Sequence, residues 1–91
     1  MDNKQLRVGI AGYGIVGKRR RQCIDSHSNL KTVAVCDQSF HGSNIILDGV
    51  RCFTNYHELL KEPLDVLFVS LPNYLAPEVT ICGLRKGLHV F

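Results

Sequence analysis

Three glycines with a fixed spacing are the first residues in this chain whose arrangement could bind a ligand. Residues 12–17 read GYGIVG and match the pattern G-x-G-x-x-G. Gly12 would allow a tight turn, Gly14 would let the backbone approach a pyrophosphate, and Gly17 would let a helix pack closely on a strand. A helix that begins here directs its free amides and positive dipole end at phosphates. The segment therefore predicts a dinucleotide-binding turn, with a purely structural glycine turn as the alternative.

Asp37 is an acid placed where such a fold binds the adenosine ribose. It follows the β-branched run 31–36 and lies about 20 residues past Gly17, the usual distance in dinucleotide-binding folds. A carboxylate there accepts hydrogen bonds from ribose hydroxyls and repels a 2′-phosphate, so NAD is favoured over NADP. NADP stays possible because Gln38 and Ser39 could contact a phosphate. The alternative for Asp37 is a solvated acid at the end of a strand.

The other residues that could do chemistry show no spacing typical of a catalytic or metal site. The four cysteines are irregularly spaced, without a Cys-x-x-Cys pair, and we interpret them as small buried apolar residues. The four histidines show no pairing and are interpreted as surface or packing residues. Ser70 lacks the G-x-S-x-G surroundings of a nucleophile elbow, and Tyr13 would lie either against a cofactor or over the glycine turn. We therefore predict no catalytic residue and no metal site.

Short apolar runs that alternate with helical segments must position these residues. Such alternation is typical of a parallel sheet with crossover helices, so we predict an α/β fold of the Rossmann type with helices on both faces of the sheet. The predicted strands are 6–11, 31–36, 51–53, 65–70 and 88–91, and the predicted helices are 15–27, 56–61 and a segment around 75–83. Between residues 38 and 50 we expect at most a turn or two of helix.

Local signals support two of these helices. Asn55 and Glu58 have the spacing of a capping box, in which each side chain bonds the other residue's backbone amide. In the last helix Pro77 falls in the first turn, where its missing N–H is harmless, and Gly87 provides a left-handed cap. The glycine turn and Asp37 then share the carboxyl edge of the sheet, where open α/β folds bind ligands.

Length and composition limit the classes of function. The chain has 91 residues and a net charge of +3, and its dense basic run 18–21 would point in nearly all directions around a helix, so we predict no nucleic-acid partner. The sequence contains no membrane-length apolar stretch and no signal-peptide pattern, which predicts no membrane partner and a cytoplasmic location. A complete doubly wound sheet needs more strands. We therefore expect a sheet that is incomplete at its C-terminus, with an edge near Phe91 that could self-associate.

Four segments in this order resemble the N-terminal domain of the glucose-fructose oxidoreductase and inositol dehydrogenase family, often written Gfo/Idh/MocA. These segments are 7–14 (RVGIAGYG), 35–37 (VCD), 69–73 (VSLPN) and 86–91 (KGLHVF). The resemblance implies hydride transfer between a nicotinamide cofactor and a hydroxyl or carbonyl carbon, usually of a sugar, cyclitol or related small molecule. It implies that the pyrophosphate is held by Gly12, Gly14, Ile15 and Val16, the adenosine ribose by Asp37, and the nicotinamide side by Leu71, Pro72 and Asn73.

The chain departs from the family's pattern at two places. Many members have a histidine three residues after the asparagine, where this chain has Ala76, and the stretch between Asp37 and Gly49 looks shortened. The family's Glu-Lys-Pro segment, whose lysine serves catalysis, would begin just after Phe91, and the substrate domain would follow. We therefore expect residues 1–91 to form the partial NAD(P)-binding domain of a dehydrogenase, inactive alone, that meets its small-molecule substrate through a domain absent here. The alternative is a non-catalytic nucleotide-sensing or interaction module.

Overall fold

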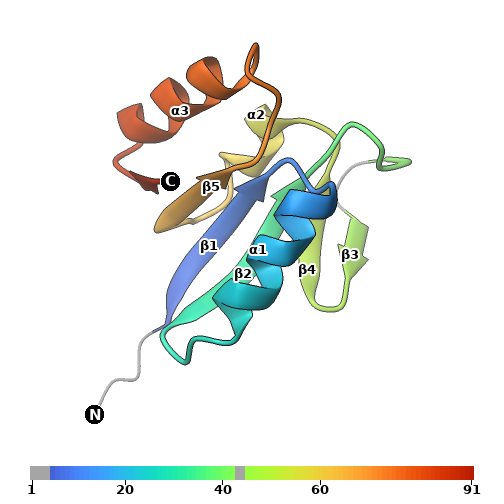
Figure 1. Cartoon of the computed structure of the whole chain (residues 1–91), viewed down its shortest axis with the longest axis vertical. Coiled ribbons are helices and arrows are strands. Elements are labelled where there is room, and N and C mark those ends of the chain that lie inside the picture. Colours follow the sequence, from blue (N-terminus) through green and yellow to red (C-terminus); the bar gives the residue numbers. More distant parts are fainter. Residues whose placement is uncertain (1–4, 43–44) are drawn as a thin grey trace.

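The fold is a single twisted sheet with helices on both faces (Figure 1). A computed structural model describes residues 5–42 and 45–91. The strands are β1 (Leu6–Ala11), β2 (Leu30–Cys36), β3 (Ile45–Leu47), β4 (Val50–Phe53), β5 (Val66–Val69) and β6 (His89–Val90). The helices are α1 (Ile15–Asp25), α2 (Tyr56–Leu59) and α3 (Ala76–Arg85).

The strand order β3-β4-β2-β1-β5-β6 places β1 in the middle of the sheet. The pairs β1–β2, β1–β5, β2–β4 and β5–β6 are parallel, and only β3 runs antiparallel to its neighbour β4. The chain therefore leaves the sheet at the same edge after β1, β2, β4 and β5. This arrangement confirms the predicted Rossmann-type sheet, with one more strand than we expected.

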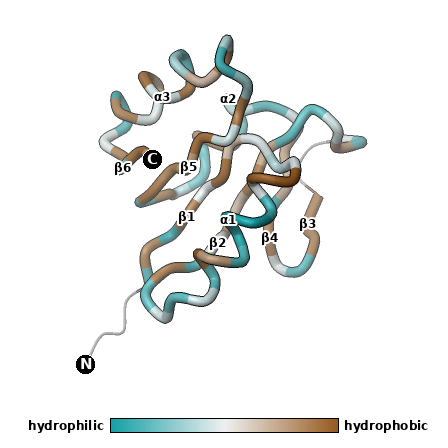
Figure 2. The backbone as a smooth tube through the Cα atoms, viewed as in Figure 1, coloured by the Kyte–Doolittle hydropathy of each residue, from teal (hydrophilic) through white to brown (hydrophobic). Residues whose placement is uncertain are grey.

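Two apolar layers hold the helices to the sheet, and they explain why the strands read as nearly continuous apolar runs. On one face, Val8 and Ile10 of β1 pack with Ile24 of α1. On the other face, Leu67 of β5 packs with Leu59 of α2 and with Val79 of α3. Figure 2 shows the apolar residues following the central strands.

The hairpin formed by β3 and β4 corrects our expectation for residues 38–50, which predicted at most a turn or two of helix. Leu47 pairs with Val50, so the connecting turn is Asp48 and Gly49. Both residues have positive φ angles, 53° at Asp48 and 76° at Gly49, as a tight two-residue hairpin turn requires. The Asp-Gly pair between apolar residues was the signal for this hairpin, and the sequence interpretation overlooked it.

Smaller differences concern helix ends and cysteines. Helix α1 ends at Asp25, with Ser26 as its cap, two residues before the predicted end. Asn55 caps α2 by accepting a hydrogen bond from the Glu58 amide at 3.0 Å, and Glu58 accepts one from the Asn55 side-chain amide at 2.9 Å.

Of the four cysteines, two are buried as predicted and one is intermediate, but Cys23 is exposed. The prediction that all four cysteines are buried is therefore wrong for Cys23, which lies on the exposed side of α1.

Candidate functional site

A cleft lies at the carboxyl edge of the sheet, between the turn that follows β1 and the loop that follows β5. Its volume is about 290 Å³. It is lined by Gly12, Gly14, Asp37, Gln38, Ser70, Leu71, Pro72 and Tyr74. The fold thus brings together five of the residues that the sequence singled out. Four others lie outside the lining: Ile15 and Val16 are exposed at the start of α1, Gly17 is buried, and Asn73 is exposed.

The three glycines of the turn differ in what surrounds them. A Cβ at Gly12, whose φ is 96°, would collide with the carbonyl oxygen of Ser70. A Cβ at Gly17 would collide with the carbonyl oxygen of Gly12. At Gly14 no atom lies within 4 Å of the position that a Cβ would take. Gly12 and Gly17 are therefore required by the packing of the turn, whereas Gly14 borders open space.

The first turn of α1 offers backbone amides to that open space. Gly14 is the N-cap residue, and no side chain caps the helix. The turn contains no acidic residue that would neutralise the positive end of the helix dipole. The amides that begin a helix have no partner within it, so this end of α1 presents hydrogen-bond donors suited to an anion.

Asp37 links the loop after β2 to the glycine turn. Its Oδ2 accepts a hydrogen bond from the Tyr13 amide at 2.7 Å, and its Oδ1 accepts one from the Ser39 amide at 2.9 Å. Partial burial favours the neutral acid, but these amides, the Ser39 hydroxyl and the positive charge of Lys18 outweigh it and lower the pKa of Asp37. The carboxylate is therefore ionised at neutral pH and faces the cleft.

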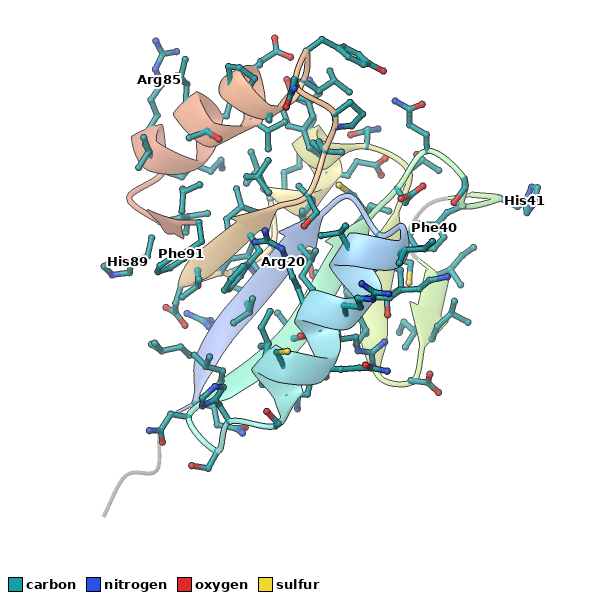
Figure 3. The ribbon with its side chains drawn as sticks, in the orientation of Figure 1. Arg20, Phe40, His41, Arg85, His89 and Phe91 are labelled. Carbon is teal, nitrogen blue, oxygen red and sulfur yellow. The ribbon has the colours of Figure 1, made fainter. Side chains whose placement is uncertain are left out.

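Tyr13 does not line the cleft, and its side chain contacts α1 and the loop after β2. Its hydroxyl accepts a hydrogen bond from Arg21 Nη1 at 2.9 Å. Its ring lies 6.1 Å from that of Phe40, and Lys18 Nζ lies 5.9 Å from the Tyr13 ring centroid. Figure 3 shows Phe40 beside the start of α1, whereas His41 points into solvent. The Tyr13 ring therefore packs among side chains of α1 and of the loop after β2.

A second, smaller cavity of about 160 Å³ lies next to the cleft. It is lined by Cys36, Asp37, Gln38, Thr54, Asn55, Tyr56, Leu71 and Leu75. Asp37, Gln38 and Leu71 also line the cleft, so the two spaces adjoin on either side of Asp37. The lining combines apolar side chains with a few polar ones, as small-molecule sites do.

Ser70, which sequence reasoning set aside, has an unsatisfied hydroxyl beside the cleft. Its Oγ is buried and has no hydrogen-bond partner, a condition shared within residues 5–42 and 45–91 only by Thr32 Oγ1. Buried polar atoms are nearly always paired, so an unpaired one often marks the place of a water or a ligand. The open space at Gly14, with the free amides of α1 beside it, and the unpaired Ser70 hydroxyl both suit a polar ligand in the cleft.

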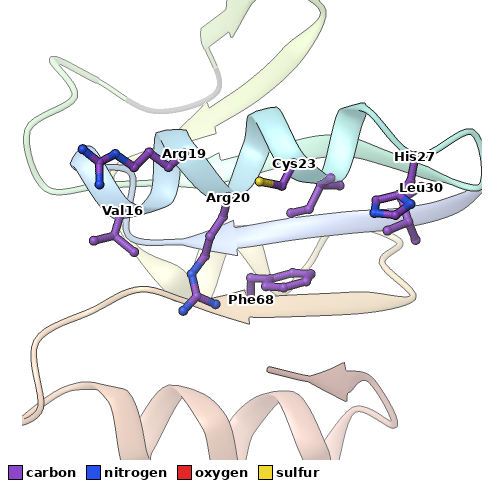
Figure 4. Close-up of a pocket in the computed structure, with 8 residues that line it drawn as sticks. Val16, Arg19, Arg20, Cys23, His27, Leu30 and Phe68 are labelled. Carbon is purple, nitrogen blue, oxygen red and sulfur yellow. The ribbon is translucent and has the colours of Figure 1, made fainter.

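A larger concavity of about 360 Å³ lies between α1 and β5 and is not part of this site (Figure 4). Its lining is mainly apolar and includes Val16, Cys23, Ile24 and Phe68. Arg20 lies over the Phe68 ring at 5.8 Å. The groove follows the side of α1 and does not include Gly14 or Asp37, so its size does not make it the better candidate for a phosphate ligand.

Comparison with known proteins decides the family. The family model described as an oxidoreductase family with an NAD-binding Rossmann fold, Gfo/Idh/MocA, matches residues 6–91. The chain belongs to the Gfo/Idh/MocA oxidoreductase family. The segment that carries the glycine turn, Asp37 and the loop after β5 is thus the NAD-binding domain of this family. Among curated proteins, none matches the chain.

Solved structures of dehydrogenases share the fold of this Gfo/Idh/MocA domain. Myo-inositol 2-dehydrogenase from Lactobacillus plantarum is 29% identical, with a TM-score of 0.79 over 97% of the chain. The WlbA dehydrogenase from Bordetella pertussis, solved with NADH and UDP-GlcNAcA, is 23% identical, with a TM-score of 0.79 over 96% of the chain. Scyllo-inositol dehydrogenase from Lactobacillus casei, solved with NAD(H) and scyllo-inositol, is 21% identical, with a TM-score of 0.79 over 97%.

This Gfo/Idh/MocA chain spans between a quarter and a third of these proteins, namely 27%, 28% and 27% of their respective lengths. Within the described residues no group of three or more histidine, cysteine or acidic side chains is arranged to hold a metal ion. Helices in the same part of the chain are too short and too polar to cross a membrane.

Proposed function

We propose that this domain holds the nicotinamide dinucleotide of an oxidoreductase that transfers a hydride to or from a sugar, a cyclitol or a related small molecule. Family membership supports the oxidoreductase class. The substrate class is supported by the 29% identical relative, which is a myo-inositol 2-dehydrogenase. The observation that carries the proposal is the open space at Gly14 beside the uncapped amides of α1.

The diphosphate would lie at the start of α1. Gly12, Gly14, Ile15, Val16 and Gly17 form the turn around it, where backbone amides donate to phosphate oxygens and the helix dipole favours their charge. A side chain at Gly14 would occupy the same space. Attraction of the diphosphate therefore depends on the backbone and requires no lysine or arginine.

The adenosine would lie across Asp37. The ionised carboxylate accepts hydrogen bonds from the ribose hydroxyls, since each of its oxygens has further acceptor capacity beyond the amide it already accepts from. The adjoining cavity has Tyr56, Leu71 and Leu75 in its lining and suits a flat base. This arrangement favours NAD, because a 2′-phosphate would be placed against the negative charge of Asp37.

The nicotinamide would lie on the other side of the cleft, near Leu71, Pro72 and Asn73. When bound, the nicotinamide supplies the hydride acceptor or donor. The residues of this chain bind and orient it, and Leu71 and Pro72 shield one side of the cleft from water. Leu71 and Pro72 are apolar and cannot exchange a proton with a substrate, so their role is to position the nicotinamide.

The direct test is titration of the purified chain with NADH and NADPH, followed by nicotinamide fluorescence or calorimetry. We expect NADH to bind more tightly than NADPH, and no NADH to form when the chain is mixed with NAD+ and inositol. Circular dichroism and a cooperative urea transition establish that the sample is folded. A folded sample that binds neither cofactor would contradict the proposal.

A further inference from the structure

Two hydrogen bonds hold Tyr13, the residue between the first two glycines of the turn. Its amide donates to Asp37 Oδ2 at 2.7 Å, and its hydroxyl accepts from Arg21 Nη1 at 2.9 Å. Both bonds are partly buried, which shields them from competing water. A residue that is fixed at its backbone and at the end of its side chain has little freedom to turn. The peptide that leads from Tyr13 to Gly14 is therefore held as well.

Arg21 is itself connected to the sheet. Its Nε donates to Asp25 Oδ2 at 3.3 Å, one helical turn further along α1. The other oxygen of Asp25 accepts a hydrogen bond from the Thr32 amide of β2 at 2.9 Å. The Arg21 side chain is only 21% exposed, so water has limited access to it. A continuous series of hydrogen bonds thus runs from β2, through two side chains of α1, to the Tyr13 hydroxyl.

The other members of the basic run 18–21 have different surroundings. Lys18 and Arg19 are exposed, and Arg20 lies over the Phe68 ring at 5.8 Å. Among the described contacts, Arg21 is the member of this run whose side chain hydrogen-bonds the glycine turn. The run therefore contains one residue with a specific contact to the site and a neighbour, Arg19, that carries the same charge elsewhere on the helix.

We propose that Arg21 is a positioning residue for dinucleotide binding, and that it acts through the Tyr13 hydroxyl. The contact holds the glycine turn in the conformation in which Gly14 and the first amides of α1 receive the diphosphate. This inference rests on the proposed function, because it assumes that the diphosphate lies at Gly14. Arg21 does not line the cleft, so its effect reaches the cofactor only through the turn.

The physical reason is that a loop arranged before the ligand arrives binds more tightly than one that the ligand must order. The observed affinity falls in proportion to the fraction of molecules whose loop has the binding conformation. Without the contact between Arg21 and Tyr13 the turn adopts other conformations, and the dissociation constant for the dinucleotide rises. A hydrogen bond that only stabilised the fold would leave the affinity of the folded chain unchanged.

The test measures NADH binding by calorimetry for Tyr13→Phe, Arg21→Met and the double variant. Tyr13→Phe removes one hydroxyl and no charge, and it leaves Arg21 paired with Asp25, so it remains informative if Arg21→Met does not fold. Arg19→Met removes the same charge as Arg21→Met from the groove beside β5 and controls for electrostatics. Gly49→Ala strains the β3–β4 turn, where φ is 76°, and controls for a loss of stability away from the cleft. The urea transition of each protein is recorded in parallel.

A second measurement needs no cofactor. The Gly12 amide donates to the carbonyl oxygen of Cys36 at 2.9 Å, and the Tyr13 amide donates to Asp37 at 2.7 Å. Local opening of the turn breaks these bonds, so hydrogen exchange of the two amides in the free protein reports how firmly the turn is held. We expect both amides to exchange faster in Tyr13→Phe and Arg21→Met, and at the wild-type rate in Arg19→Met.

We expect Tyr13→Phe and Arg21→Met each to weaken NADH binding by about fivefold, the size of one hydrogen bond. The double variant should bind as Arg21→Met does, because both substitutions remove the same contact. Arg19→Met and Gly49→Ala should stay within about twofold of wild type, since an exposed charge contributes little at a distance and the β3–β4 turn is remote from the cleft.

Wild-type affinity in both Tyr13→Phe and Arg21→Met, with only their urea transitions changed, would overturn the inference and leave the proposed function intact. An equal loss of affinity in Arg19→Met and Arg21→Met would also overturn it, because charge alone would then explain the effect. A folded wild-type chain that binds no NADH would reject the proposed function itself and this inference with it.

Discussion

At Gly14 the missing side chain leaves space, whereas at Gly12 and Gly17 it avoids a collision with backbone. The G-x-G-x-x-G pattern shows only that glycine occurs at all three positions. The structure separates the roles, because a Cβ at Gly12 or Gly17 would meet a carbonyl oxygen and a Cβ at Gly14 would meet nothing within 4 Å. Binding and stability should therefore respond differently to substitution along the same turn.

We predict that Gly14→Val abolishes NADH binding with little loss of stability. The φ of Gly14 is −81°, which any residue adopts, so the added side chain strains no backbone. The free energy of unfolding should fall by less than about 1 kcal/mol, the difference between glycine and valine at an N-cap. Gly17→Val is the matched control, and its collision with the turn should cost about 3 kcal/mol or more. Retained NADH affinity in a folded Gly14→Val protein would show that the ligand does not pass this position.

At the residue scale, the glycines and Asp37 could be proposed as site residues from the sequence, because their types and spacing match a known pattern. The hydrogen bonds that Asp37 accepts could not be predicted, because the Tyr13 and Ser39 amides belong to the backbone and do not depend on residue type. The Ser70 hydroxyl was set aside for want of a nucleophile motif, yet its burial without a partner becomes visible only in the folded chain.

Among the secondary-structure elements, the β3–β4 hairpin is where prediction and structure differ most. The long strands were predicted from their apolar and β-branched runs, and α1 from the glycine turn that precedes it. The hairpin strands have three and four residues, too few for periodicity, and the side chains of β3 are all exposed. β4 was expected as a strand at 51–53, so the part that was missed is β3 and the turn, whose sequence signal is the pair Asp48 and Gly49.

We predict that Gly49→Ala lowers the free energy of unfolding by about 1 kcal/mol, because alanine is strained at positive φ. No atom lies within 4 Å of the Cβ position, so a steric clash contributes nothing to this cost. Asp48→Gly tests the same turn in the opposite sense and should be close to neutral, since glycine adopts its φ of 53° readily. Urea unfolding of both variants measures the difference. A Gly49→Ala variant as stable as wild type would mean that the turn adopts another conformation.

At the scale of the whole molecule, burial in the two apolar layers controls access to the thiols. Cys36 is 2% exposed, and burial, its largest influence, raises its pKa to about 11. Cys52 is also buried and its pKa is raised for the same reason, whereas Cys23 is exposed on α1. Thiolates are the reactive form, so Cys36 and Cys52 are protected in two ways: reagents cannot reach them, and their thiols stay protonated.

We predict that a thiol reagent at neutral pH modifies Cys23 rapidly and modifies Cys36 and Cys52 only when the fold opens. Cys23→Ser should remove the reaction of this exposed thiol and leave that of the half-buried Cys82, and the slow phase should follow the unfolding equilibrium as urea is added. Because NADH would bind only the folded chain, saturating NADH should slow the reaction of Cys36 further. Peptide mass spectrometry identifies each modified cysteine. Rapid modification of Cys36 in the absence of urea would contradict the tight packing of β2.

The hydrogen bonds to Asp37 have a consequence for how this protein can evolve. Under the proposed function, one carboxylate both discriminates between coenzymes and ties the loop after β2 to the glycine turn through the Tyr13 amide. A substitution of Asp37 that changes the coenzyme preference also removes this hydrogen bond, and the loops at the entrance of the cleft then become less firmly connected. Lineages that switch from NAD to NADP should therefore carry a compensating substitution nearby, and single replacements of the acid should gain the new coenzyme at the expense of thermal tolerance.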